Sequence, residues 1–175
     1  LFKDKDPRML GSILYPSCPW QGSRVEVRKG IIKPDGTIVT ASSLSDKYEG
    51  TNTTIAAKDG TLTSTDVTKT GFYIKKFMTP NKVVDYEKGE TNWMVFRYAE
   101  VLLNYAEACV ELGDDAEALR AVNLIRERAG IAPRTTINRD QVRHERKVEL
   151  AFENHRWWDI RRWHIADQLL NAKQF

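Results

Sequence analysis

The sequence predicts a mostly α-helical protein whose first half is rich in loops and contains one short β-hairpin. Two observations lead to this fold class. From Trp93 onward, apolar residues recur at the three- and four-residue spacing of a buried helix face, and Gly or Asn residues separate the runs. Before that point, turn-forming residues are frequent and apolar runs are short. We therefore expect a loop-rich region over 1–92 and a helical region over 93–175.

The loop-rich region contains one clear hairpin pattern. Apolar and polar residues alternate from Val25, the segment PDG at 34–36 is a turn former, and residues 37–40 are typical of a returning strand. We therefore expect a β-hairpin over about 25–40. Residues 41–71 carry few large apolar side chains, so we expect them to form a surface loop.

The helical region contains four periodic segments. Gly113 and Asn154 are expected to end helices in left-handed conformations, because both residue types tolerate positive φ. The segments are expected to form helices over 93–112, 114–129, 140–153 and 156–163.

The first two helices resemble a hairpin of the tetratricopeptide type. In this arrangement Ala106 and Ala118 lie where the close crossing of two helices needs small residues. A lone repeat cannot cover both of its faces. We therefore expect apolar side chains such as Leu103 or Ile125 to lie exposed.

The composition excludes several classes of protein. Of the 175 residues 41% are hydrophobic, and five Trp, six Tyr and six Phe argue against intrinsic disorder. A net charge of +3 is too small to indicate nucleic-acid binding, and two cysteines cannot make a four-thiolate zinc site. His144-Glu145 begins a zinc-protease motif, but Val148 occupies the position of the second histidine. We expect neither a metal nor a cofactor.

The two regions differ in their cations. Residues 1–92 hold 14 Lys and Arg, of which 11 are Lys, whereas residues 93–175 hold 13, of which 11 are Arg. The helical region also holds 13 acids, and Arg meets carboxylates through a planar, bidentate fork. These equal numbers indicate internal ion pairs rather than a charged face for a partner.

Three acids of the helical region, Glu145, Glu149 and Glu153, follow at four-residue steps and so share one helix face. A pair of carboxylates on opposite sides of a sugar would indicate a glycoside hydrolase, but acids on one helix face cannot flank a sugar in this way. The spacing therefore favours structural ion pairs. The expected partners are Arg97, Arg126, Arg128, Arg156 or Arg162.

Trp157, Trp158 and Trp163 lie among arginines, which could indicate base stacking with nucleic acid. The segment 139–163 holds seven cations and five acids, so its net charge is only +2. Large aromatic residues at helical spacing favour core packing, and we expect these three side chains in the core.

Trp20 is the first candidate for a ligand contact. It lies in the Pro- and Gly-rich segment 16–22, which shows neither helix nor strand periodicity. Two interpretations remain open: the side chain packs into the core, or it is a flat platform for the apolar C–H face of a sugar. Tyr48 and Tyr73 are the other candidate platforms.

Three motifs of the helical region resemble those of a known family. Residues 97–108 read RYAEVLLNYAEA, residues 123–130 read NLIRERAG, and residues 145–163 read ERKVELAFENHRWWDIRRW. They are similar, in this order, to the RxAExLLxxAEA, NxxRxRAG and ERxxELxxEGxRWxDLxRW motifs of the SusD/RagB family of nutrient-binding lipoproteins from Bacteroidetes. Two weaker matches are DPR at 6–8 and TGFYIKKF at 70–77.

The resemblance implies non-enzymatic binding of a glycan or another nutrient at the surface of the outer membrane. The partner would be a SusC-like TonB-dependent transporter, and a lipid anchor absent from this chain would attach the protein to the membrane. Family members are longer and carry further tetratricopeptide helices, so we expect the chain to be the C-terminal portion of such a protein and one incomplete domain. Two alternatives stay open: a helical-repeat protein-interaction module and a glycoside hydrolase.

Overall fold

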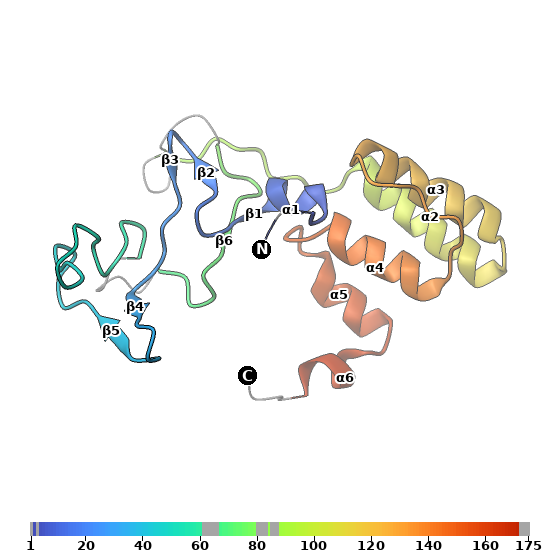
Figure 1. Cartoon of the computed structure of the whole chain (residues 1–175). Coiled ribbons are helices and arrows are strands. Elements are labelled where there is room, and N and C mark those ends of the chain that lie inside the picture. Colours follow the sequence, from blue (N-terminus) through green and yellow to red (C-terminus); the bar gives the residue numbers. More distant parts are fainter. Residues whose placement is uncertain (1, 3, 61–66, 80–83, 85–87, 172–175) are drawn as a thin grey trace. The chain divides into compact units, whose positions relative to one another are not determined.

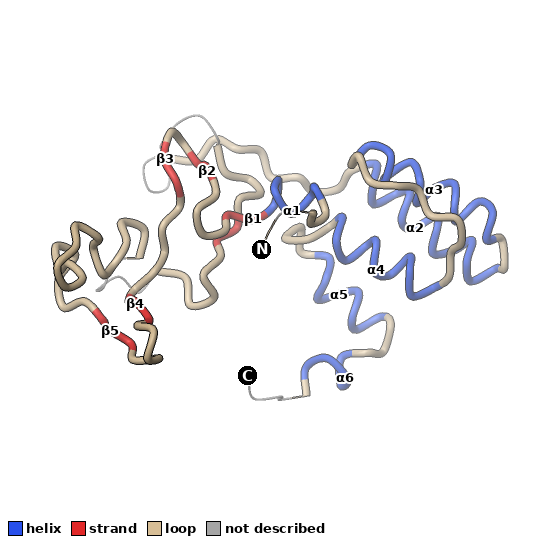
Figure 2. The backbone as a smooth tube through the Cα atoms, viewed as in Figure 1, coloured by secondary structure: helices blue, strands red, loops and turns tan. Residues whose placement is uncertain are grey.

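The chain folds into two compact units in the computed structural model. We call them the helical unit, Leu1–Ser12 with Asn92–Phe175, and the loop unit, Ile13–Thr91. Helices dominate the first, whereas turns and short β-ladders make up the second (Figures 1 and 2). The predicted fold class is confirmed. The structure describes residues 2, 4–60, 67–79, 84 and 88–171.

The helices of the helical unit end where the sequence has capping residues. Gly113 has φ = 79° after the first long helix and Asn154 has φ = 64°, so both predicted left-handed breaks are confirmed. The side chain of Asp114 accepts a hydrogen bond from the N–H of Glu117 and caps the next helix. No helix in the described ranges is long and apolar enough to cross a membrane. The helices are α1 (Pro7–Ser12), α2 (Tyr98–Leu112), α3 (Asp115–Arg128), α4 (Arg139–Glu149), α5 (His155–Arg162) and α6 (Ala166–Leu170).

Two helices are shorter than predicted. α2 begins at Tyr98 rather than at residue 93, because Arg97 is extended, with φ −149° and ψ 164°. α4 ends at Glu149 rather than at residue 153, because the chain turns there and Phe152 has φ = 66°. The sequence does not predict α1 and α6, which are too short to show a helical period.

The α2–α3 hairpin packs through small residues. Ala106 and Ala118 are fully buried, which lets the two helices approach closely. Leu103 and Ile125 are only 0% and 2% exposed, so the prediction that they face solvent is wrong. The physical reason is that Leu150, which follows α4, joins them in one buried cluster. The large apolar residues that α2 does expose are Tyr98, Val101, Tyr105 and Leu112.

The tryptophans of α5 and its end differ in burial. Trp163 is buried, and its indole N–H donates to Glu107 at 2.7 Å. Trp157 and Trp158 are 51% and 65% exposed, so the prediction of core packing is wrong for these two. α5 turns Asp159 and Ile160 inward instead, and only one face of a helix can do so.

The loop unit is built from three short antiparallel ladders. The predicted hairpin is confirmed over 30–40, where Gly36 closes the turn with φ = 85°. The prediction is wrong for 25–29, because Val25 is buried and its N–H donates to the carbonyl oxygen of Cys18 at 3.0 Å. The ladders are β1 (Ile13–Leu14) with β6 (Tyr73–Ile74), β2 (Pro19–Trp20) with β3 (Ser23–Arg24), and β4 (Gly30–Ile32) with β5 (Ile38–Thr40).

Part of the segment predicted as surface loop is buried. The N–H of Ala57 donates to the carbonyl oxygen of Arg28, and that of Asp59 donates to Glu26, both at 2.9 Å. Gly60 follows these contacts, and a Cβ at this position would lie 2.8 Å from the carbonyl oxygen of Arg28. Backbone pairing thus buries apolar side chains that the sequence assigns to the surface. They are Ile55, Ala56 and Ala57, and Val67 is buried as well.

Candidate functional site

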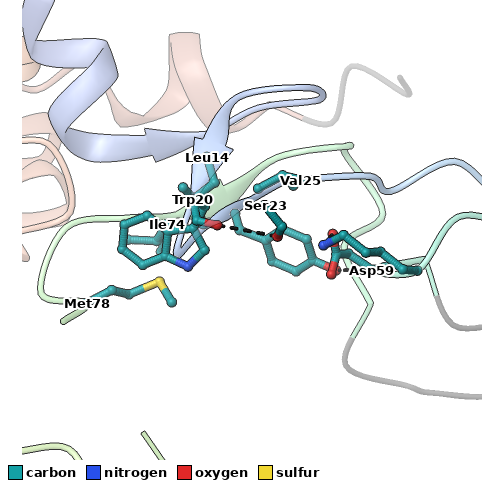
Figure 3. Close-up of a pocket in the computed structure, with 9 residues that line it drawn as sticks. Leu14, Trp20, Ser23, Val25, Asp59, Ile74 and Met78 are labelled. Carbon is teal, nitrogen blue, oxygen red and sulfur yellow. Dashed lines mark hydrogen bonds and ion pairs between the residues drawn. The ribbon is translucent and has the colours of Figure 1, made fainter. Parts of the chain in front are cut away.

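A hollow in the loop unit is a candidate binding site. It has a volume of about 360 Å³ and opens to solvent. In Figure 3, Trp20 and Met78 lie at one end of the hollow and Asp59 lies at the other. Its lining residues are Leu14, Trp20, Ser23, Val25, Lys58, Asp59, Tyr73, Ile74 and Met78.

A tight turn positions Trp20. Gln21 and Gly22 connect β2 to β3 with φ values of 44° and 79°, and two successive positive φ angles are typical of a type I′ hairpin turn. The hydroxyl of Ser23 donates to the carbonyl oxygen of Trp20 at 3.4 Å. The sequence shows no strand pattern here, because each strand has only two residues. The turn fixes the backbone of Trp20 and leaves its indole partly exposed.

Tyr73 lines one side of the hollow, next to the buried apolar side chains at its base. It lies on β6 and pairs with Leu14 of β1. Its hydroxyl donates to the carbonyl oxygen of Asp59 at 3.2 Å and accepts from the N–H of Thr68 at 3.3 Å. These two bonds hold the ring in one orientation. Leu14 and Val25 are both buried and supply apolar surface beneath it.

The rim of the hollow is polar. Asp59 Oδ2 accepts from the N–H of Glu26 and from Lys58 Nζ, both at 2.8 Å. Lys75 Nζ lies 5.7 Å from the centroid of the Trp20 ring. An aromatic plate beside fixed polar groups suits a ligand with both C–H faces and hydroxyls, as a sugar has.

The structure brings two of the three predicted platforms together. Trp20 and Tyr73 line the same hollow, whereas Tyr48 does not line it and begins a turn in which its N–H donates to the carbonyl oxygen of Thr53 at 2.9 Å. The sequence does not reveal Lys58 and Asp59 as rim residues. They lie in a polar stretch, and the contact that brings this stretch to the hollow is a backbone pairing with no local signal.

The three glutamates at four-residue steps, which we call the acid ladder, lie in the interior of the helical unit. Glu145, Glu149 and Glu153 are 1%, 3% and 7% exposed. Arg97 bonds to Glu149 at 2.6 Å and to Glu153 at 2.7 Å. Arg8 of α1 bonds to Glu145 at 2.7 Å and to Glu149 at 3.0 Å, and the sequence does not predict this partner.

The remaining predicted arginines differ in their partners. Arg126 bonds to Glu145 at 2.8 Å, and Arg128 bonds to Glu149 at 2.7 Å. Arg162 bonds instead to Glu107 at 2.6 Å and to Asp159 at 3.0 Å. Arg156 pairs with no acid among the described residues, and its guanidinium carbon lies 6.0 Å from the ring centroid of Trp163.

The arginines change the titration of Glu149. Burial opposes ionisation of Glu149, but hydrogen bonds from Arg97 and Arg8 outweigh it and hold the pKa of this carboxyl below its ordinary value. A general acid needs a raised pKa, so Glu149 is suited to an ion pair and not to proton donation. Within the described residues, no three His, Cys, Asp or Glu side chains are grouped as a metal site would require.

Two curated relatives match part of the chain. "SusD-like protein P2" of Formosa agariphila is 40% identical over an alignment that covers 47% of this chain and 19% of that protein. A "SusD-like protein" of Bacteroides ovatus is 36% identical and covers 46% of this chain and 16% of its own length. The chain thus spans less than a fifth of the length of these two relatives.

Solved structures match nearly all of the chain. A SusD-like carbohydrate binding protein from Bacteroides fragilis has a TM-score of 0.64 and 30% identity, covering 97% of this chain and 31% of that one. A second SusD-like protein from the same species has a TM-score of 0.64 and 32% identity, covering 95% and 29%. The model of the SusD family matches residues 1–174. The chain therefore belongs to the SusD family.

Proposed function

We propose that the protein binds a glycan in the hollow of the loop unit and releases it unchanged. The observation that carries this proposal is the partly exposed indole of Trp20, held by a two-residue turn over a hollow with an apolar floor and a polar rim. A sugar stacks its C–H face on such a ring and bonds its hydroxyls to the rim. Family membership supports the proposal, since one solved relative is described as a carbohydrate binding protein.

The proposal extends to uptake at the outer membrane. Family membership supports a place beside a SusC-like TonB-dependent transporter, with attachment to the membrane through a lipid anchor. Solubilised outer membranes that express a tagged form of the complete protein should yield the transporter in the same complex. Recovery of the tagged protein alone, without a β-barrel partner, would contradict this part.

The geometry of the acid ladder argues against hydrolysis. Glu145, Glu149 and Glu153 are buried and bonded to arginines, so they offer no accessible nucleophile, and the lowered pKa of Glu149 does not suit a general acid. We expect the complete protein to release no reducing ends from any glycan that it binds.

Replacement of Trp20 by Ala tests the binding site. A glycan array identifies a ligand of the complete protein, and calorimetry then compares the variant with the parent. We expect the variant to lose about 1–3 kcal/mol of binding free energy, the range for a stacking aromatic residue at a binding centre. Trp158→Ala is the matched control, because Trp158 is exposed and lies on α5 of the helical unit. Equal affinity of Trp20→Ala and parent would remove Trp20 from the site.

A further inference from the structure

The charge around the Trp20 ring points to a narrower class of ligand. Lys75 Nζ lies 5.7 Å from the ring centroid, within the range in which a cation is attracted to an aromatic face. A sugar that stacks on this indole therefore lies a few ångströms from an ammonium group.

The rim of the hollow is rich in hydrogen-bond donors. Lys58 is half exposed and uses one of its three N–H groups to bond to Asp59 at 2.8 Å. Lys75 likewise carries three N–H donors and lies beside the Trp20 ring. The hydroxyl of Ser23 is also exposed at the rim.

The rim has little negative charge to repel an anion. Asp59 is the one carboxylate among the described residues that line the hollow. Its Oδ2 accepts from Lys58 and from the N–H of Glu26, so this charge is compensated within the protein. Glu26 lies outside the hollow and pairs with Arg28 at 3.2 Å.

We infer that the hollow selects an anionic sugar, one that carries a carboxylate or a sulfate. Its C–H face stacks on Trp20, and its anionic oxygens accept from Lys75 or, at the other end of the hollow, from Lys58. This inference rests on the proposed function, because it names the ligand class of the same site.

Matched pairs of probes test the inference. Trigalacturonate is compared with its methyl ester, and fucoidan with desulfated fucoidan, so that each pair differs in charge and keeps its sugar. Binding to the complete protein is measured by calorimetry. We expect the anionic member of at least one pair to bind about tenfold more tightly than the neutral member. This preference should shrink as NaCl rises from about 0.05 to 0.5 M, because salt screens exposed charges.

Lysine variants locate the effect. Lys75→Met and Lys58→Met keep the apolar stem of the side chain and remove its charge, so each should reduce the preference for the anionic member. Lys47→Met is the control, since Lys47 is exposed in the same unit and does not line the hollow. Lys75→Arg should retain the preference.

The outcomes separate this inference from the proposed function. If neutral glycans bind as well as anionic ones and Trp20→Ala weakens both, the charge selectivity is wrong and the glycan site stands. If Lys75→Met and Lys58→Met leave the preference unchanged, the assigned lysines are wrong and the inference falls. If the complete protein binds no probe and no glycan on an array, both the inference and the proposed function are overturned.

Discussion

The two units of this protein are stabilised by different interactions. The helical unit buries three glutamates against arginines, so charge-assisted hydrogen bonds fix where its segments meet. The loop unit has ladders of only two or three residue pairs, and close backbone approaches such as that at Gly60 hold it together. The difference indicates where binding residues can lie: the buried carboxylates of the helical unit are paired with arginines, whereas Lys47 and Lys58 of the loop unit are exposed.

Glu149→Ala should have the largest effect, because it removes the partner shared by Arg8, Arg97 and Arg128. Two of these guanidinium groups, those of Arg8 and Arg97, are largely buried, and each would lose one of its carboxylate partners. We expect the free energy of unfolding to fall by about 3–5 kcal/mol, measured by urea denaturation of the complete protein. Glu117→Ala is the control for an exposed pair, since Glu117 bonds to Arg120 on the surface of α3 and should matter far less. Equal losses of unfolding free energy in Glu149→Ala and Glu117→Ala would contradict the expectation that the buried ion pairs matter more than the exposed one.

Gly60→Ala tests the backbone packing of the loop unit. The new Cβ would lie 2.8 Å from carbonyl oxygens of Val27 and Arg28, so the backbone must shift. We expect a loss of about 1–3 kcal/mol in the free energy of unfolding, typical of overpacking. Gly89→Ala is a matched control, because nothing lies within 4 Å of its Cβ position and the substitution should be tolerated. If Gly60→Ala left the free energy of unfolding unchanged, the close backbone contact at Gly60 would not be needed for stability.

Acid should weaken the helical unit through Glu107. Burial opposes ionisation of this carboxyl, but hydrogen bonds from Arg162 and Trp163 outweigh it and hold its pKa below the ordinary 4.5. Because the folded-state value is the lower one, Glu107 stabilises the fold fully above about pH 4.5, and this contribution is lost as the pH falls through the folded-state pKa. The urea midpoint of the parent should therefore fall more steeply on acidification than that of Glu107→Gln. Parallel plots of urea midpoint against pH for the parent and the variant would show that Glu107 makes no such contribution.

Tyr73→Phe should have the smallest effect. It removes one hydroxyl that bonds to Asp59 and Thr68 and keeps the ring in the wall of the hollow. We expect a loss of about 0.5–1.5 kcal/mol in the free energy of unfolding, the usual net value of a hydrogen bond. Glycan affinity should change little if the ring face, and not the hydroxyl, contacts the ligand. A large loss of affinity with unchanged stability would assign the hydroxyl to the ligand.

Local chemistry made part of the fold predictable. Gly113 and Asn154 end helices because their residue types tolerate positive φ, and the turn around Gly36 follows from the same rule. The shared face of the glutamates follows from the helical period, although Glu153 is beyond the end of α4.

Contacts between distant segments were not predictable. Arg8 and Glu145 are 137 positions apart, and no local pattern selects one arginine among many as the partner. The pairing of Ala57 with Arg28 depends on backbone groups that every residue has, so the buried stretch near Gly60 resembles an ordinary polar loop. The exposure of Trp157 and Trp158 depends on which segments pack against α5. A helical period alone does not identify those segments.

Two arginines of the helical unit that flank the loop unit in the sequence bond to one carboxylate. Arg8 lies just before the unit begins at Ile13, Arg97 lies just after it ends at Thr91, and both bond to Glu149. These ion pairs thus hold in place the two chain segments between which the loop unit is inserted. Each doubling of the length of a flexible insert costs only about 0.6 kcal/mol in closure entropy. During evolution such a segment can lengthen, shorten or be exchanged between relatives while the pairing of Arg8 and Arg97 with Glu149 is kept. Ligand preference can then diverge without redesign of the helices.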